Sequence, residues 1–198
     1  MTVEAIRKIS KPDIVVADTG PLIHLSQANA LSLLHEIGGS VVIVDMVRHE
    51  ATRNLAKPEA EALDRWIEDG RKPGSNRPVR LERTETGRAF ETALKAEPTF
   101  RMKDGGETAI VQWLIETVDA TDLQTIVVYE NGKVPSWIGN RNMDADIDIL
   151  TTRAFLLLAE RRGLIRSAEA GWAKIEQASP TTNPTIAALS HRRPRPGK

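Results

Sequence analysis

The chain of 198 residues balances 27 Lys and Arg against 27 Asp and Glu, so its formal net charge at pH 7 is zero. At roughly 150 residues per domain, this length indicates one domain with extensions. The absence of Cys excludes a disulfide framework, a Cys-ligated zinc site and thiol catalysis, and it fits a cytoplasmic location. No apolar run approaches the roughly 20 residues of a membrane span, so we expect no membrane association. The balanced charge also argues against broad electrostatic coating by nucleic acid, although it leaves a local basic groove open.

The chain opens with a polar lead-in, residues 1–12, which has no secretory apolar region. Residues 14–17 (IVVA) then form a short β-branched run followed by turn residues, which predicts a strand. Leu and Ile at helical spacing predict a helix over residues 22–37, ended by two Gly. The pattern continues with a predicted strand at residues 41–44 and predicted helices at 46–55 and 59–67.

The middle of the chain repeats this alternation. Residues 70–78 (GRKPGSNRP) are a basic loop with Gly and Pro turn signals. Residues 79–81 favour a third strand and residues 86–96 a helix. Glu107 opens another helix with an apolar side, and residues 126–129 (IVVY) are the next buried-type strand.

The last part of the chain begins with a long polar loop, residues 133–146. A final strand is predicted at residues 147–150, followed by helices over 153–162 and 168–178. From Ser179 onward the sequence is rich in Pro, Thr and Arg, which is typical of a disordered tail.

Short apolar strands that alternate with helices are typical of a parallel sheet covered on both faces. We therefore predict an α/β fold, with three layers (α/β/α) and a central, mainly parallel sheet. Residues 13–178 form the domain in this interpretation, the lead-in 1–12 precedes it, and residues 179–198 are a flexible basic tail.

Several common enzyme sites are unsupported by the sequence. There is no G-x-G-x-x-G after the first strand, no GK[ST] of a P-loop, no H-E-x-x-H and no G-x-S-x-G. Position 20, two residues after Asp18, is Gly, so the paired acids of Asp-x-Asp phosphatases are missing too. These eliminations leave carboxylates as the candidate chemistry.

Four acidic residues occupy positions that favour a site. Asp18 and Glu130 each follow a buried-type strand directly, and the carboxyl ends of strands are where α/β sheets place working groups. Glu50 lies on the helix after the second strand, and Glu107 lies at a helix start. Crowded carboxylates need a cation to neutralise them, and oxygen ligands suit Mg²⁺ or Mn²⁺. The acids therefore point to metal-dependent phosphodiester cleavage, although Asp18 also suits a helix N-cap and Glu107 a first helical turn.

Four short motifs carry a resemblance to a known family. Residues 14–25 (IVVADTGPLIHL) resemble the opening motif of PIN-domain proteins, and residues 41–50 (VVIVDMVRHE) resemble that family's second strand and acid-bearing helix. Residues 104–110 (DGGETAI) resemble its Gly-Glu helix start, and residues 150–165 resemble the closing helix of one subgroup. The motifs occur in order over roughly residues 13–166, and together they are more specific than any one of them.

The resemblance implies a Mg²⁺- or Mn²⁺-dependent ribonuclease of the bacterial toxin subgroup (VapC-like). By this resemblance Asp18, Glu107 and Glu130 are metal ligands and act in catalysis together with Glu50. It further implies the toxin of a type II toxin–antitoxin pair, with tRNA or rRNA as candidate RNA substrates, a cognate antitoxin as partner, and a homodimer. Candidate substrate-binding residues are Thr19, Arg53 and Arg153.

The sequence departs from the subgroup after the fourth strand. The subgroup usually has paired Asp residues there, whereas this chain has Tyr129-Glu130-Asn131. Glu130 is one candidate for the fourth acid, and Asp144, Asp146 and Asp148 are the alternatives. Because of this departure, a second function stays an alternative: the chain would be a catalytically decayed PIN-like module that binds protein or RNA. His24 is interpreted as an ordinary helix residue.

Overall fold

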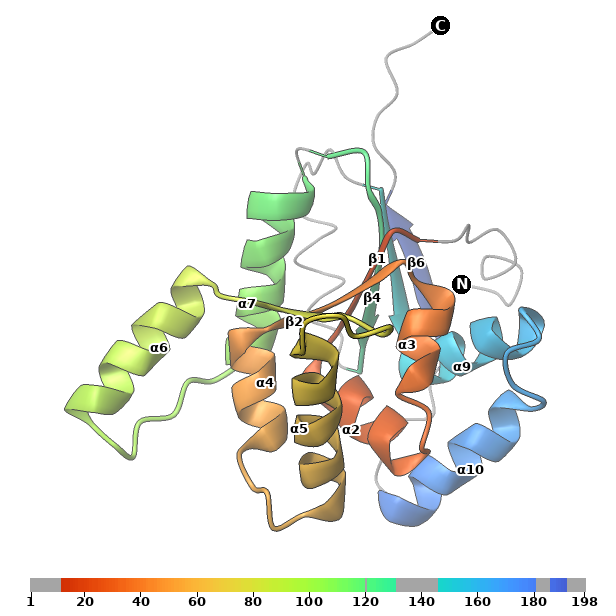
Figure 1. Cartoon of the computed structure of the whole chain (residues 1–198), viewed down its shortest axis with the longest axis horizontal. Coiled ribbons are helices and arrows are strands. Elements are labelled where there is room, and N and C mark those ends of the chain that lie inside the picture. The colour runs from red at the N-terminus through yellow and green to blue at the C-terminus, as the bar shows by residue number, and fades with distance from the viewer. Residues whose placement is uncertain (1–11, 120, 131–145, 181–185, 192–198) are drawn as a thin grey trace, which may run out of the picture.

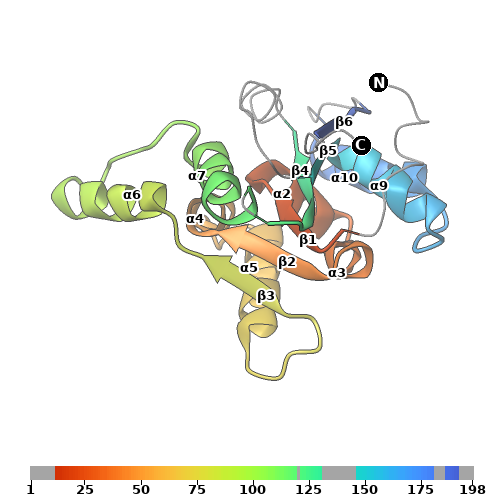
Figure 2. The same ribbon diagram turned by 90° about the horizontal axis from the view of Figure 1, so that it is seen from above.

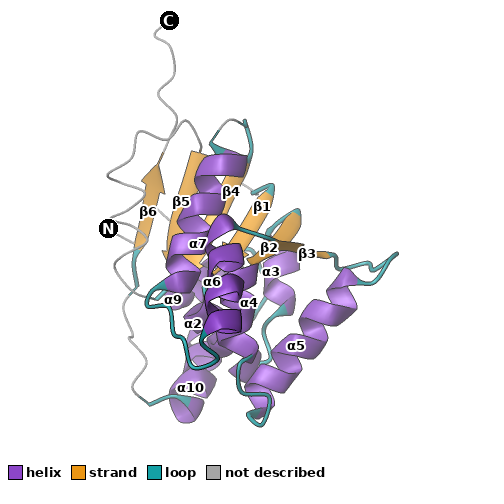
Figure 3. Ribbon diagram, turned by 90° about the vertical axis from the view of Figure 1, so that its left-hand side faces the viewer, coloured by secondary structure: helices purple, strands orange, loops and turns teal. Residues whose placement is uncertain are grey.

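The computed structural model describes residues 12–119, 121–130, 146–180 and 186–191. Within these residues, six strands form one sheet in the order β3-β2-β1-β4-β5-β6 (Figures 1 and 3). Neighbouring strands are parallel except for β6, which is antiparallel to β5. The strands are β1 (Ile14–Ala17), β2 (Ser40–Val44), β3 (Val79–Glu82), β4 (Gln124–Tyr129), β5 (Asp146–Thr151) and β6 (Ala188–His191).

Helices cover both faces of this sheet. The helical elements are α2 (Thr19–Gln27), α3 (Ser32–Ile37), α4 (Asp45–Thr52), α5 (Pro58–Arg71), α6 (Glu85–Ala96), α7 (Gly105–Trp113), the π-helical turn η1 (Leu114–Val118), α9 (Thr152–Arg161) and α10 (Ala168–Ala178). Helix α7 lies on one face, and α3 and α9 lie on the other (Figures 1 and 2). The predicted three-layer α/β/α fold with a central, mainly parallel sheet is confirmed. No helix in the described ranges is long and apolar enough to span a membrane.

The central strands explain why the sheet forms. All four residues of β1 are buried, and so are the last four of β2 and the last five of β4. β-Branched side chains fit a strand that packs against helices on both faces. These strands therefore give the sheet a rigid apolar centre from which the connecting segments emerge.

The direction of the strand order reverses beside β1. The chain passes from β1 to β2 and β3 on one side, whereas β4 and β5 lie on the other side of β1. This reversal is the topological switch point at which open α/β sheets place their sites. The backbone N–H of Asp18 donates to the carbonyl of Val128 at 2.9 Å, so the end of β1 is joined directly to β4.

The helix predicted over residues 22–37 is two helices, α2 and α3. The interruption lies at Asn29, which has a φ of 54°. A left-handed conformation ends a helix, and Asn adopts it more readily than most residues do. The apolar spacing continued across this break, so periodicity alone did not reveal it.

Residues 188–191, predicted to belong to the flexible tail, instead form β6. Its Cα pairs run from Ile147↔His191 to Leu150↔Ala188, and Ala188 is buried. The physical reason is the open edge of β5, whose unpaired backbone groups favour another strand. The helix predicted at residues 168–178 is confirmed as α10. The lead-in up to residue 11, most of the 133–146 loop and residues 192–198 lie outside the described residues.

Candidate functional site

The structure brings Asp18, Glu50, Glu107 and Glu130 to the carboxyl edge of the sheet, beside the switch point. Asp18 follows β1 and Glu130 follows β4, while Glu50 lies on α4 and Glu107 in the first turn of α7. The carboxylates of Glu107, Glu50 and Glu130 all act electrostatically on Asp18. Four acids that are far apart in the sequence therefore share one electrostatic environment.

Asp18 is the buried centre of this group. Its side chain is only 6% exposed, and burial raises its pKa to about 7. The backbone N–H of Thr19 opposes this shift, and the three neighbouring carboxylates add to it. Asp18 occupies the N-cap position of α2, yet its side chain makes no capping hydrogen bond. Capping of α2 therefore does not account for a carboxyl group at this position.

Glu50 is held in place from two sides. The hydroxyl of Thr19 donates to its Oε2 at 2.9 Å, and the backbone N–H of Gly106 donates to its Oε1 at 2.9 Å. A Cβ at position 106 would lie 2.8 Å from Glu50 Oε2 and 3.3 Å from Asp18 Oδ1. Glycine is therefore required for the close approach of α7 to these acids. Thr19, predicted to bind substrate, orients Glu50 in this structure.

Glu130 is held by residues of α2 and α9. The hydroxyl of Thr152 donates to Glu130 Oε1, and Nδ1 of His24 lies 3.2 Å from the same oxygen. A Cβ at Gly20 would lie 3.0 Å from Glu130 Cγ, so the missing side chain makes room for the glutamate.

The sequence interpretation missed His24 as a site residue. Gly20 and His24 are four residues apart on α2 and therefore lie on the same face of the helix. The spacing of four residues between His24 and Gly20, in the turn that carries Asp18, is the sequence signal that would have identified His24.

Asp146 and Asp148, the other candidates for the fourth acid, lie on β5 before its carboxyl end. In the parallel β4–β5 pair, Asp146 lies beside Gln124, Asp148 beside Ile126, and Thr151 beside Tyr129. Asp146 is thus five residues from the carboxyl end of β5, about 16 Å at the usual strand rise. Asp144 lies outside the described residues. Among the described residues, Glu130 is the candidate that lies with Asp18, Glu50 and Glu107 at the carboxyl edge.

Asp45 shows that an acid after a strand need not belong to the site. It follows β2 just as Asp18 follows β1, but both oxygens of its carboxylate accept hydrogen bonds. Asp45 accepts from the backbone N–H groups of Met46 and Thr84, at 2.9 Å each, and from the Thr84 hydroxyl at 2.8 Å. Asp45 therefore stabilises the start of α6.

The donor set at the carboxyl edge fits a divalent metal in its chemistry. Carboxylate oxygens are the ligands that Mg²⁺ and Mn²⁺ prefer. A cation would also offset the carboxylate repulsion that adds to burial in raising the pKa of Asp18. In the described ranges, however, no three acidic, His or Cys side chains already form a metal-binding group. Hydrogen bonds fix the side-chain positions of Glu50 and Glu130 in this structure.

A cavity of about 760 Å³ borders this acidic site, with Thr19, Glu50 and Arg53 among its lining residues. Arg53, predicted to bind substrate, therefore lines the same cavity as Glu50. Arg153 lies elsewhere, because its guanidinium is 2.9 Å from Glu169 and stacks 5.5 Å over the Trp172 ring. It packs against α10 and is not among the cavity's lining residues.

Comparison with known proteins bears on the first third of the chain. Residues 14–73 match the sequence model of a family described as a PIN domain, and this span contains Asp18 and Glu50. No curated protein and no solved structure matches. The match supports the PIN-domain family, whose members are in general nucleases that act on nucleic acid.

Proposed function

We propose that this protein is a divalent-metal-dependent endoribonuclease that hydrolyses RNA phosphodiester bonds. The observation that carries the proposal is the convergence of Asp18, Glu50, Glu107 and Glu130 at the switch point, with the pKa of Asp18 raised to about 7. Such a strongly perturbed carboxyl group in a recess is typical of a functional site. The PIN-domain match includes Asp18 and Glu50, and it supports a nuclease over other enzymes that use carboxylates.

In this proposal Asp18, Glu107 and Glu130 hold Mg²⁺ or Mn²⁺, and Glu50 is the further acid that acts with them in catalysis. A divalent ion there supplies charge stabilisation for the reacting phosphate and lowers the pKa of the attacking water. Two of these four acids are preoriented by neighbours, Glu50 by Thr19 and Glu130 by His24. Water breaks the P–O bond in this reaction, so we expect products without a 2′,3′-cyclic phosphate.

We further propose, from the resemblance to the bacterial toxin subgroup, that the protein is the toxin of a type II toxin–antitoxin pair. Its expected substrates are tRNA or rRNA, its expected state is a homodimer, and it would act in the cytoplasm. A short neighbouring gene for a DNA-binding protein with a flexible tail would support this role. Coexpression with that partner should abolish cleavage.

The direct test is incubation of the purified protein with tRNA and rRNA in Mn²⁺, in Mg²⁺ and in chelator. We expect cleavage only with metal, and its loss in Asp18→Asn, which keeps the side-chain shape but removes the charge. Glu61→Gln is the matched control, because Glu61 lies on the exposed face of α5. Cleavage that persists in Asp18→Asn would contradict the proposal.

The second candidate is a PIN-like module that binds RNA or protein without cleaving. The observation that favours it is Glu130, a longer side chain than the subgroup's Asp, whose Oε1 is already bonded to Thr152 and His24. In that case the folded, metal-supplied protein binds RNA and leaves it intact.

A further inference from the structure

The ends of β4 and β5 place two side chains next to each other at the carboxyl edge of the sheet. In this parallel pair Tyr129 lies opposite Thr151, so the residues that follow them, Glu130 and Thr152, leave the sheet side by side. Thr152 is the first residue of α9 and is fully buried, at 0% exposure. Its hydroxyl donates to Glu130 Oε1. The register of the sheet therefore brings a threonine hydroxyl to one of the four acids.

Threonines of three other helices use their hydroxyls differently. The hydroxyls of Thr52, Thr92 and Thr108 each donate to the backbone carbonyl four residues earlier in the chain. Such a bond to the preceding turn is common for a threonine in a helix. Thr152 instead bonds a carboxylate that lies 22 residues away in the sequence. Its hydroxyl therefore does not serve the backbone of α9.

Thr151, the adjacent residue, shows what a purely structural threonine does at this place. It is also buried, at 3% exposure, and as the N-cap of α9 its side-chain oxygen accepts from the backbone N–H of Ala154 at 3.3 Å. The backbone N–H of Ala187 donates to the same oxygen at 3.2 Å. Thr151 thus holds the start of α9 and the segment before β6, whereas Thr152 holds Glu130.

Thr19 repeats the arrangement of Thr152 elsewhere in the site. It is the first residue of α2, as Thr152 is of α9, and its hydroxyl donates to Glu50 Oε2 at 2.9 Å. A hydrogen bond to a carboxylate is stronger than one between neutral groups, and burial strengthens it further. In both places a helix that begins after a parallel strand therefore starts with a hydroxyl that fixes an acid from another segment.

We propose that Thr152 is a positioning residue of the cation site, which holds Oε1 of Glu130 and thereby leaves Oε2 to bind the metal. This inference rests on the proposed function, because it concerns the ion of that same site. Nδ1 of His24 also lies 3.2 Å from Oε1, and Oε2 accepts no hydrogen bond within the described ranges. Rotation of the carboxylate would break both contacts, so Glu130 is oriented before an ion arrives. Hydrogen bonds to metal-binding side chains commonly contribute to metal affinity in this way.

The test is Mn²⁺ binding to the purified protein without RNA, followed by the loss of the EPR signal of free Mn²⁺. Thr152→Val removes the hydroxyl and keeps the shape of the side chain, and we expect it to bind Mn²⁺ about tenfold more weakly than the wild type. Thr152→Ser retains the hydroxyl and should bind Mn²⁺ nearly as the wild type does. Rescue by serine separates the hydrogen bond from the packing of the threonine methyl group.

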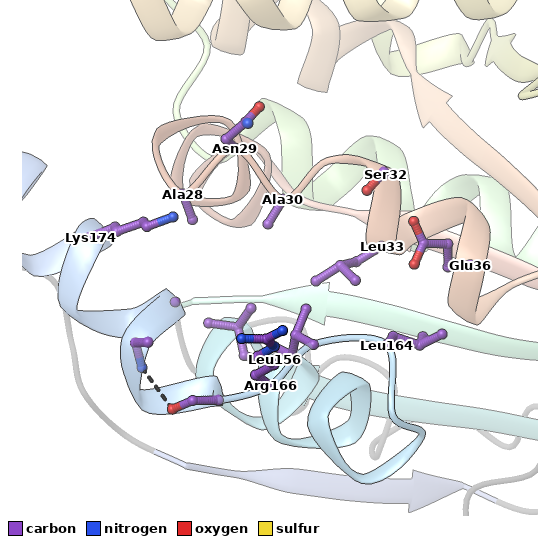
Figure 4. A pocket seen from close by; sticks show the side chains of 14 residues that line it. Ala28, Asn29, Ala30, Ser32, Leu33, Glu36, Leu156, Leu164, Arg166 and Lys174 are labelled. Carbon is purple, nitrogen blue, oxygen red and sulfur yellow. Dashed lines mark hydrogen bonds between the residues drawn. The ribbon is translucent and has the colours of Figure 1, made fainter.

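Two control variants weaken α9 without touching Glu130. Thr151→Val makes the same substitution one residue earlier and removes the helix cap. Leu156→Val trims the same helix one turn after Thr152, where Leu156 lines a cavity of about 320 Å³ between α3, α9 and α10 (Figure 4). Both variants should lower the midpoint of thermal unfolding and leave Mn²⁺ affinity unchanged. A less stable α9 alone would therefore not reproduce the result for Thr152→Val.

The outcomes separate the positioning role from the nuclease. Weaker Mn²⁺ binding in Thr152→Val but in neither control, restored by Thr152→Ser, supports the role even if the protein cleaves no RNA. Wild-type affinity in Thr152→Val, an equal loss in Thr151→Val, or a failure of Thr152→Ser to restore binding would overturn it, even if the wild type cleaves RNA. Absence of Mn²⁺ binding by the wild type would overturn both the role and the cation site.

Discussion

Asp18 combines burial with three carboxylate neighbours, and this combination makes the protein's stability depend on pH. Its pKa is about 7 in the folded protein against 3.8 as the ordinary value. Between these two pKa values the folded state holds a proton that the unfolded state has released. The free energy of unfolding, measured without metal, therefore falls as pH rises. The full decrease, reached above pH 7, is on the order of 4 kcal/mol.

We therefore predict that Asp18→Asn removes this pH dependence. In chelator, the variant should gain stability relative to the wild type between pH 5 and pH 8, because Asn stays uncharged. Urea unfolding of both proteins at the two pH values measures the difference. If the difference between their free energies of unfolding is the same at pH 5 and pH 8, Asp18 does not titrate in this range.

His24 acts on the site through Glu130, as a positioning residue. Because its Nδ1 contacts Glu130 Oε1, we predict that His24→Ala lowers kcat for RNA cleavage about 10- to 100-fold, the usual effect of removing a ligand's hydrogen-bond partner. KM for RNA should change little, and the Mn²⁺ concentration for half activity should rise.

His24→Asn is the matched variant for this residue, because its amide nitrogen can replace Nδ1. It should recover most of the activity that His24→Ala lacks. A fall in activity that His24→Asn does not rescue, or one seen only in KM, would show that His24 does not act by positioning Glu130.

At the scale of elements, the packing of α5 against β3 depends on Gly70. A Cβ there would lie 2.4 Å from Val79 Cγ2 and 3.0 Å from the Val79 backbone nitrogen. The backbone of Val79 can move away only if β3 is distorted. We therefore predict that Gly70→Ala destabilises the protein by about 1–3 kcal/mol. Thermal unfolding measures the change.

Gly171 on α10 is the control for this prediction. A Cβ there would lie 3.5 Å from Leu156 Cδ1, which is ordinary van der Waals separation. Gly171→Ala should therefore stabilise the protein by about 0.5–1 kcal/mol through helix propensity. Equal effects of the two substitutions would contradict the packing argument.

At the scale of the whole molecule, the sheet and its acids were largely predictable. Runs such as residues 14–17 and 126–129 are β-branched and too short for helices, so they indicated strands at β1 and β4. The ordered motifs placed Asp18, Glu50 and Glu107 in one family pattern, and the strand order explains their convergence.

Other features depend on contacts that the sequence does not encode locally. Asp18 and Asp45 both follow buried strands, and only the distant Thr84 shows that Asp45 stabilises α6. The contact of His24 with Glu130 joins residues 106 positions apart. β6 forms because β5 has an open edge, which the tail's composition does not reveal.

The central claim is that acids from four segments act as one cation site, and Mn²⁺ binding followed by isothermal titration calorimetry tests it most directly. At pH 6 the wild type should bind Mn²⁺ and release close to one proton, because the pKa of Asp18 is about 7. Asp18→Asn should bind at least about tenfold more weakly and release almost none, while Glu61→Gln matches the wild type. Absence of binding by the wild type, or unchanged binding by Asp18→Asn, would contradict this account.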